Sequence, residues 1–198
     1  MSAASPRYFD RRASGYLAAS ERQPWKMVRA GEWRALRSAL RLAPGQNVLD
    51  LGCGPGHYSL RMRAVADIRL HGVDHSAAMM HAYRAQGFEG THCRAEDFVS
   101  PRRFDRVLLA GLLEFVEDPE EVFRPLSRLL AESGRAVCLV PKPGLIGAIY
   151  GSVHALASCP TRLRDPELYS RIAERHGLKI LERTSATFMG IVLVFGFA

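Results

Sequence analysis

Several features that would assign a function at once are missing from this sequence. Its four cysteines form no Cys-x-x-Cys pair, which argues against a zinc ribbon or a dithiol redox motif. The first residues, Met1 to Arg7, lack the apolar core of a secretory signal peptide. The apolar stretches at 144–157 and 188–198 are shorter than the roughly 20 residues that cross a membrane. We therefore expect a cytoplasmic protein with reduced thiols, no metal and no transmembrane segment.

Acidic residues are scarce in one part of the chain. The net charge is +7, and residues 1–42 hold nine arginines and lysines against three acids. Such a segment could meet nucleic acid, an anionic membrane surface, or an acidic protein or substrate, and it could equally be a solvated arginine-rich helical face. With 47% hydrophobic residues in 198, the composition fits one folded domain and argues against disorder.

The most informative stretch is V-L-D-L-G-C-G-P-G, residues 48–56. An apolar run that includes Asp50 precedes a Gly-x-Gly-x-Gly turn, and residues 57–65 are compatible with a helix. Because glycine brings no side chain between the backbone and a ligand, this order of strand, turn and helix predicts the first half of a βαβ nucleotide-binding unit. A dinucleotide fingerprint would need its third glycine at position 57, which is His57.

These nine residues closely resemble motif I of the class I S-adenosylmethionine-dependent methyltransferases. The resemblance covers residues 48–140 with specific motifs, the last 35 residues in pattern, and residues 7–16 loosely. It implies an α/β, Rossmann-like fold: a seven-stranded sheet with helices on both faces, a last strand that runs antiparallel, and a helical N-terminal extension. We expect residues 1–42 to form a helical cap, residues 43–198 the cofactor-binding domain, and residues 141–165 an insertion on the substrate side.

Turn and cap residues place the individual elements. Residues 7–42 read as helical with breaks at Gly15, Pro24 and Gly31. Asp118 before Pro119 and Asp165 before Pro166 each predict a helix start. The expected helices are 57–65, 77–86, one that stops at 134 and one that stops at 177, and the expected strands are 48–51, 68–74, 91–98, 104–111, 136–140, 179–188 and 190–198.

The second expected strand ends in Asp74, eighteen residues after Gly56. An acid at that strand end can accept both hydroxyls of a ribose. The resemblance implies that Met79 lies against adenine and that Asp97, or Glu96 in its place, accepts from the adenine amino group; a core methionine and a helix-capping Asp97 explain the same residues. The residues expected to bind the cofactor, S-adenosyl-L-methionine, are Asp50, Gly52, Cys53, Gly54, Gly56, Asp74, His75, Met79, Glu96, Asp97, Phe98 and Ala110.

The opening Y-F-D-R-R-A-S-G-Y, residues 8–16, resembles the F-D-R-x-A-x-x-Y lead-in of methyltransferases that act on quinone precursors, tetrapyrroles or carrier-protein thioesters. In those relatives the segment caps the cleft, although aromatics here could also merely dock a helix on the core. The expected lid and substrate residues are Tyr8, Phe9, Tyr16, Phe115 and Tyr150. Lys142, Tyr150, His154, Arg162 and Arg164 could contact an acidic substrate, or belong to a plain structural helix and loop.

Methyl transfer from a sulfonium is an in-line displacement in which the protein mainly aligns the acceptor and excludes water. Phe115 stands where the family often has His or Tyr, which leaves His154, His57 and Tyr16 as candidate bases. No Asn/Asp-Pro-Pro-Tyr motif follows the fourth expected strand, where A-G-L-L stands at 110–113, and this argues against the amino groups of nucleobases as acceptors.

We therefore expect methyl transfer to an oxygen or carbon of a small acidic or hydrophobic molecule. An acidic carrier protein could present that acceptor to the basic N-terminal segment, whereas nucleic acid is not an expected partner. Two alternatives stay open: an RNA-binding or RNA-modifying protein that uses the basic segment, and a non-catalytic regulatory module that binds S-adenosylmethionine.

Overall fold

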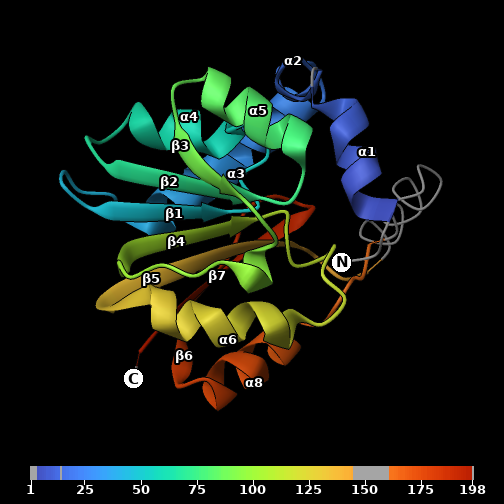
Figure 1. The fold of residues 1–198 in the computed structure, drawn as a ribbon. Helices are drawn as coiled ribbons and strands as arrows, with labels where there is room; N and C mark the ends of the chain where they lie inside the picture. The colour runs from blue at the N-terminus through green and yellow to red at the C-terminus, as the bar shows by residue number, and fades with distance from the viewer. Residues whose placement is uncertain (1–3, 14, 145–160, 198) are drawn as a thin grey trace.

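The computed structural model of this chain describes residues 4–13, 15–144 and 161–197. Its centre is a seven-stranded sheet with the order β3-β2-β1-β4-β5-β7-β6, with α3, α4 and α5 over one face and α6 and α8 over the other (Figure 1). The strands are β1 (Asn47–Leu51), β2 (Arg69–Asp74), β3 (Glu89–His92), β4 (Phe104–Ala110), β5 (Leu130–Pro141), β6 (Leu178–Ser185) and β7 (Gly190–Phe197). The helices are α1 (Ala4–Arg12), α2 (Tyr16–Ser20), α3 (Trp25–Leu40), α4 (His57–Arg63), α5 (Ala77–Ala85), η1 (Ala95–Asp97), α6 (Pro119–Leu129) and α8 (Pro166–Arg175).

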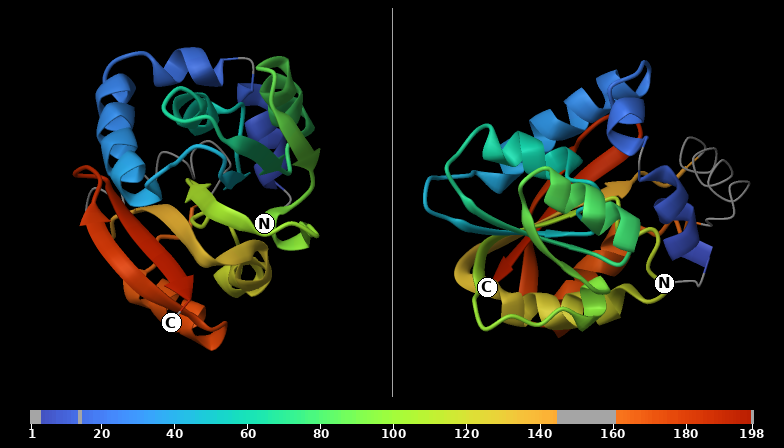
Figure 2. Two further views of the ribbon diagram at one scale, coloured as in Figure 1. Left: turned by 90° about the vertical axis from the view of Figure 1, so that its left-hand side faces the viewer. Right: turned by 45° about the horizontal axis from the view of Figure 1, so that its top comes forward.

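The strand directions confirm the predicted fold class. β1 lies between β2 and β4 and is parallel to both, so that Asp50 faces Gly72 on one side and Leu108 on the other. β7 is inserted between β5 and β6 and runs antiparallel to each. Figure 2 shows the twist of the sheet and the β6 and β7 pair at one edge. Because the first parallel strands end at one edge, their following loops meet there.

Three predicted boundaries are wrong. The third strand spans Glu89–His92 instead of 91–98, because the chain turns after His92 and forms the short helix η1 at Ala95–Asp97. α3 continues through Gly31; a Cβ on Gly31 would lie 2.8 Å from Thr187 Cγ2, so glycine here permits close packing instead of ending the helix. α6 ends at Leu129, five residues before Gly134. Leu130 already pairs with Phe104 in β5, and a register shift after that pair accommodates the intervening residues. The predicted N-caps Asp118 and Asp165 are confirmed.

Helix α3 packs on the central strands. Leu36 and Leu40 are fully buried in a cluster that also contains Val48, Leu108 and Val137. Burying leucine against the sheet removes its side chain from water, which is worth roughly 1.5–3 kcal/mol for each residue. The opposite face carries the exposed Arg34 and Arg37, and the exposed Arg41 follows the helix as its C-cap. Among the described residues, none of the helices is both long enough and apolar enough to span a membrane.

Candidate active site

A cavity of about 720 Å³ opens at the carboxyl ends of the first parallel strands. Its walls come from the loop after β1, the end of β2, the segment after β4, the end of β5, and helices α1, α2 and α3. Figure 1 shows α1 beside α5 at this side of the molecule. In open α/β sheets, ligands bind at this position, outside the carboxyl ends of the strands.

The glycine turn after β1 forms the floor of the cavity. Gly52, Gly54 and Gly56 have φ values of 75°, 53° and 94°, a region that side-chain-bearing residues rarely adopt. The amides of Gly52 and Cys53 both donate to the carbonyl of Val73, at 2.8 and 3.0 Å. The turn is thus tied to β2, and Gly52, Cys53 and Gly54 line the cavity.

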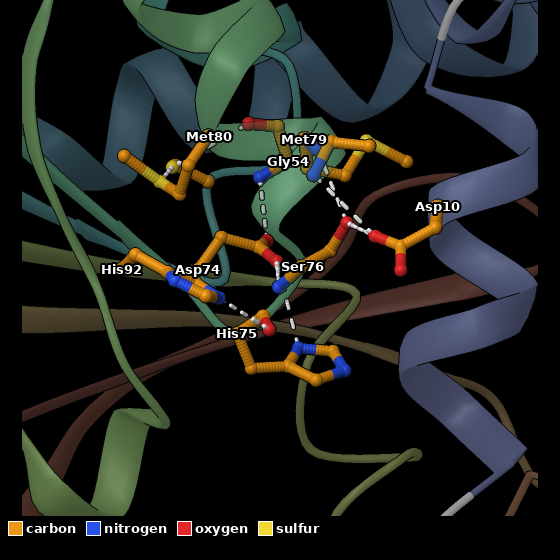
Figure 3. A network of polar contacts seen from close by, with 10 residues as sticks. Asp10, Gly54, Asp74, His75, Ser76, Met79, Met80 and His92 are labelled. Carbon is orange, nitrogen blue, oxygen red and sulfur yellow. Dashed lines mark hydrogen bonds and ion pairs between the residues drawn. The ribbon is translucent and has the colours of Figure 1, made fainter.

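Asp74 lies beside this turn at the end of β2. Its Oδ2 accepts the amide of Gly54 at 2.9 Å and its Oδ1 accepts the amide of Ser76 at 2.9 Å, as Figure 3 shows. His75 Nδ1 lies 3.5 Å from Oδ1. Each carboxylate oxygen carries two lone pairs, so Asp74 has the capacity to bind two further hydroxyl donors while it holds the loop.

Asp50 lines the cavity from beneath the turn and is 2% exposed. Its Oδ2 accepts from Ser59 Oγ at 2.6 Å, and Ser59 Oγ is 3.1 Å from the Tyr83 hydroxyl. Burial raises the pKa of Asp50 to about 7, the hydrogen bond from Ser59 opposes this rise, and the charge of Asp74 adds to it. A cationic ligand group beside Asp50 would favour its charged form.

A second polar cluster lies where α2, α3 and α4 meet the cavity. Arg29 donates to Glu32 Oε2 at 2.8 Å, to the Tyr58 hydroxyl at 3.2 Å and to the Tyr16 hydroxyl at 3.3 Å. The Tyr58 hydroxyl donates to Glu32 Oε2 at 2.6 Å. Burial opposes the charge of Arg29, but Tyr16, Tyr58 and Glu32 together raise its pKa well above the ordinary value. Arg29 therefore stays cationic in the cavity wall.

His57 lines the cavity next to this cluster. It is 7% exposed, and its Nε2 has no hydrogen-bond partner among the described residues. Burial, with the nearby charges of Arg29 and Arg61, lowers the pKa of His57 to about 4. The ring is therefore neutral at neutral pH and offers one donor and one acceptor to a ligand.

Helix α1 covers one side of the cavity with aromatic residues. The Phe9 ring meets the Tyr8 ring at 5.1 Å, the Phe115 ring at 5.2 Å and the His75 ring at 5.9 Å, each edge to face. Such pairs contribute about 0.5–1.5 kcal/mol beyond area burial. Tyr8, Phe9, Tyr16 and Phe115, the described residues among those expected in the lid and substrate site, all line the cavity; their role as a lid stays a prediction.

The far side of the cavity is mainly apolar. Leu139 and Val140 from the end of β5 line it, and so do two aromatic side chains that project into solvent: Trp25 is 42% exposed and Phe188 is 62% exposed. The buried Glu114 contributes a carboxylate to the same lining. A mostly apolar pocket with few polar groups is typical of a small-molecule site.

Lys142 anchors the loop that carries Phe188, and Arg164 anchors the segment after β4. Lys142 Nζ donates to Ser185 Oγ at 2.6 Å and to the Thr187 carbonyl at 2.7 Å. Arg164 donates to the carbonyls of Leu113, Val116 and Glu117 at 2.6–2.9 Å. Both cations therefore brace loops around the cavity and are not part of its lining.

The predicted cofactor residues divide into two groups. Eight of them line the cavity: Asp50, Gly52, Cys53, Gly54, Asp74, His75, Met79 and Ala110. Four do not line it. Gly56 is packed behind the turn, where a Cβ would lie 3.1 Å from the Tyr83 ring. Glu96 pairs with Arg94, Asp97 is exposed, and Phe98 is buried in the core against His71.

Of the candidate bases, Tyr16 and His57 reach the cavity. Arg162 forms an ion pair with Glu117 at 3.6 Å and does not line the cavity. Tyr150 and His154 lie outside the described residues, as does most of the expected insertion at 141–165. Within the described residues, no group of three or more His, Cys, Asp or Glu side chains could hold a metal ion.

The fold is Rossmann-like, and the cavity lies where proteins of this fold class bind their cofactors. Residues 25–183 match the family model described as "Methyltransferase domain", and the chain belongs to this family. Ubiquinone biosynthesis O-methyltransferase of Sodalis glossinidius is 30% identical over 151 residues, which are 67% of this chain and 57% of that protein. The chain thus spans less than two thirds of the length of that relative.

Solved structures share the fold. A methyltransferase in complex with the Trm112 methyltransferase activator of Haloferax volcanii is 19% identical with a TM-score of 0.78, and the match covers 95% of this chain and 96% of that chain. Magnesium protoporphyrin IX methyltransferase of Synechocystis PCC 6803 with bound SAH is 16% identical with a TM-score of 0.76, and the match covers 98% of each chain. These likenesses confirm the predicted fold.

Proposed function

We propose that this chain binds S-adenosylmethionine in the cavity and transfers its methyl group to a small, largely apolar molecule. One observation carries the proposal: the glycine turn after β1 and the carboxylate of Asp74 after β2 face the same cavity and are joined by the hydrogen bond from Gly54. A turn without side chains and an acid with free lone pairs suit the backbone and ribose of a nucleoside cofactor.

The charges in the cavity suggest how the cofactor is oriented. The ribose hydroxyls would bind Asp74, with the adenine toward His75 and Met79, which line the cavity near α1. The α-amino acid end would then extend over the turn toward the polar cluster. There Asp50 would accept its ammonium group, and Arg29 with the unpartnered Nε2 of His57 would bind its carboxylate.

The acceptor would occupy the apolar side of the cavity. Trp25, Phe188 and the end of β5 would contact its apolar part. The sulfonium supplies the activated methyl group, so the residues around it have to align the acceptor and exclude water. Where the acceptor carries a proton, the candidates to receive it among the groups lining the cavity are the side chain of Glu114, the neutral imidazole of His57 if its ring faces the acceptor, and Tyr16 once its own hydroxyl proton has been lost.

The exposed arginines, the free thiols and the N-terminal helices bear on the partner, the cellular location and the cap. The exposed stripe of Arg34, Arg37 and Arg41 suits an acidic carrier protein that presents the acceptor. The thiols of Cys53, Cys93 and Cys138 are free, which supports a reducing compartment such as the cytoplasm. Residues of α1 and α2 line the cavity, which supports the proposal that the N-terminal segment forms a cap over it.

Isothermal titration calorimetry with S-adenosylmethionine, S-adenosylhomocysteine (SAH) and NAD tests the cofactor assignment. We expect the first two to bind and NAD not to bind. Asp74→Ala should weaken SAH binding by about 1–3 kcal/mol, because the ribose hydroxyls lose their acceptor. The matched control is Asp118→Ala, which removes an exposed N-cap acid outside the cavity. Unchanged affinity in Asp74→Ala would show that the ribose assignment is wrong.

Transfer of a labelled methyl group distinguishes an enzyme from a module that only binds the cofactor. Purified protein with methyl-labelled S-adenosylmethionine should label an apolar phenol or carboxylic acid from a mixed acceptor panel. Binding of the cofactor without labelling of any acceptor in that panel would favour the non-catalytic alternative. A salt-sensitive gel shift with RNA, together with labelled RNA, would instead favour the RNA-directed alternative.

A further inference from the structure

Asp10 connects α1 to the beginning of α5. Its Oδ1 accepts the hydroxyl of Ser76 at 2.5 Å and lies 3.4 Å from the amide of Ala78. Figure 3 shows the carboxylate of Asp10 pointing from α1 toward this helix end. The two partners are 66 residues apart in sequence, so the bond fixes the position of α1 and is not a local turn.

The beginning of α5 is suited to receive an acid. Ser76 is the N-cap of α5, and its Oγ accepts the amide of Met79 at 3.1 Å. The first amides of a helix lack intrahelical partners and carry a partial positive charge, which favours a carboxylate beside them. Asp10 therefore completes the cap of a helix to which it does not belong.

Ser76 also connects this cap to the acid that would bind the ribose. Its amide donates to Asp74 Oδ1 at 2.9 Å while its hydroxyl donates to Asp10. Asp74 in turn accepts the amide of Gly54 through its other oxygen. The network in Figure 3 thus extends from α1 through Ser76 and Asp74 to the glycine turn.

A second contact joins α1 to the same short segment. The Phe9 ring, one residue before Asp10, meets the His75 ring edge to face at 5.9 Å. Phe9 lines the cavity, whereas Asp10 is exposed to solvent on its outer side. Replacing Asp10 therefore removes the polar connection and leaves the aromatic lining in place.

We propose that Asp10 is a positioning residue that holds α1 closed over the cofactor cavity by binding Ser76, and that this closure is coupled to the orientation of Asp74. The inference rests on the proposed function, because it assumes that a cofactor occupies the cavity. The bond between Asp10 and Ser76 breaks when α1 opens. Closure of α1 therefore strengthens cofactor binding, and cofactor binding favours the closed α1. Thermodynamic linkage makes the free energies of these two effects equal.

The rate of SAH release tests the proposal by stopped-flow tryptophan fluorescence, with Trp25 in the cavity wall as reporter. Asp10→Ala should release SAH roughly tenfold faster than the wild type, which corresponds to one charge-assisted hydrogen bond. Asp10→Asn keeps an oxygen for Ser76 and should restore most of the wild-type rate. The control Asp165→Ala removes the cap acceptor of the Glu167 amide on α8 and should leave the rate unchanged.

Trypsin cleavage after Arg11 and Arg12 measures the opening of α1 without relying on a cofactor. Local opening must precede cleavage within a helix. The N-terminal fragment should appear faster from Asp10→Ala than from the wild type in the absence of ligand. SAH should slow cleavage of the wild type more than that of the variant. In this cleavage assay Ser76→Ala should add little to Asp10→Ala, because the bond between these two residues is lost in both; the loss of the cap on the Met79 amide in Ser76→Ala affects α5 and not the opening of α1.

The outcomes separate this inference from the proposed function. If the wild type binds no SAH, the cofactor assignment fails, and the cleavage of the unliganded proteins still decides whether Asp10 holds α1. If the wild type binds SAH but Asp10→Ala has the same SAH release rate and the same cleavage rate as the wild type, the proposal that Asp10 holds α1 closed is wrong. Slower release from Asp10→Ala would also overturn it, since loss of a closing contact cannot prolong residence.

Discussion

The buried carboxyl group of Asp50 should make the stability of this protein depend on pH, and one substitution should remove that dependence. Burial raises the pKa of Asp50 from 3.8 to about 7; the hydrogen bond from Ser59 lowers it and the charge of Asp74 raises it further. The folded protein therefore binds a proton on Asp50 that the unfolded chain has released. The resulting stabilisation is fully present below about pH 4 and is lost as the pH rises through about 7.

The size of this effect follows from the shift in pKa. A pKa difference of one corresponds to about 1.4 kcal/mol. The difference between 3.8 and about 7 for Asp50 therefore corresponds to about 4 kcal/mol of stability, of which about 2.5 kcal/mol is lost between pH 5 and pH 8. Asp50→Asn has nearly the same shape and keeps an oxygen that can accept from Ser59 Oγ, but it does not titrate. Relative to Asp50→Asn, the wild type should therefore lose about 2.5 kcal/mol over that range.

Urea unfolding of both proteins, followed by tryptophan fluorescence at several pH values, measures this difference. Subtracting the Asp50→Asn curve removes the contribution of every other titrating group that the two proteins share. The pair of wild type and Asp165→Asn, which makes the same substitution at an exposed acid, is the matched control. Parallel curves for the wild type and Asp50→Asn would refute the assignment of a raised pKa to this carboxyl group.

Two further substitutions test the packing around the cavity. Gly72→Ala should destabilise the fold by about 1–3 kcal/mol, because the added Cβ would lie 2.4–2.6 Å from atoms of the Tyr83 side chain; thermal unfolding checks this against Gly15→Ala, which meets nothing within 4 Å. Phe188→Ser should weaken the binding of the apolar dye 1-anilinonaphthalene-8-sulfonate to the SAH-bound protein severalfold, because it removes cavity lining. The control Val99→Ser, at a position that is 85% exposed and outside the cavity lining, should leave dye binding unchanged. If Phe188→Ser binds the dye as tightly as the wild type does, the assignment of this side of the cavity to the acceptor is contradicted.

The sequence predicted the part of the fold whose signals are local. The strand ending at Leu51, the glycine turn and the strand ending at Asp74 lie within one short stretch, where residue type and spacing restrict the backbone directly. The N-caps Asp118 and Asp165 are likewise local signals and are confirmed. The end of α6 was missed because pairing of Leu130 with Phe104 across the sheet determines it, and no local residue marks that pairing.

The polar cluster in the cavity wall was missed for a similar reason. Tyr16 was expected in the lid, but its partners Arg29, Glu32 and Tyr58 come from two other helices, and each of these three is an ordinary residue of a helical surface until the fold brings them together. One signal was available: Arg29 and Glu32 are three residues apart in a helix, with Val28 and Leu36 also buried on it. Asp97, for which a motif resemblance implied a cofactor contact, is exposed outside the cavity lining, and that contact stays a prediction.

A crystal structure of the protein with SAH tests the central claim most directly. We expect the nucleoside to lie in the cavity with both ribose hydroxyls on Asp74, the adenine beside Met79, and the amino acid end between Asp50 and the pair formed by Arg29 and His57. SAH bound elsewhere, or bound in the cavity with its ribose away from Asp74, would contradict the account of this site.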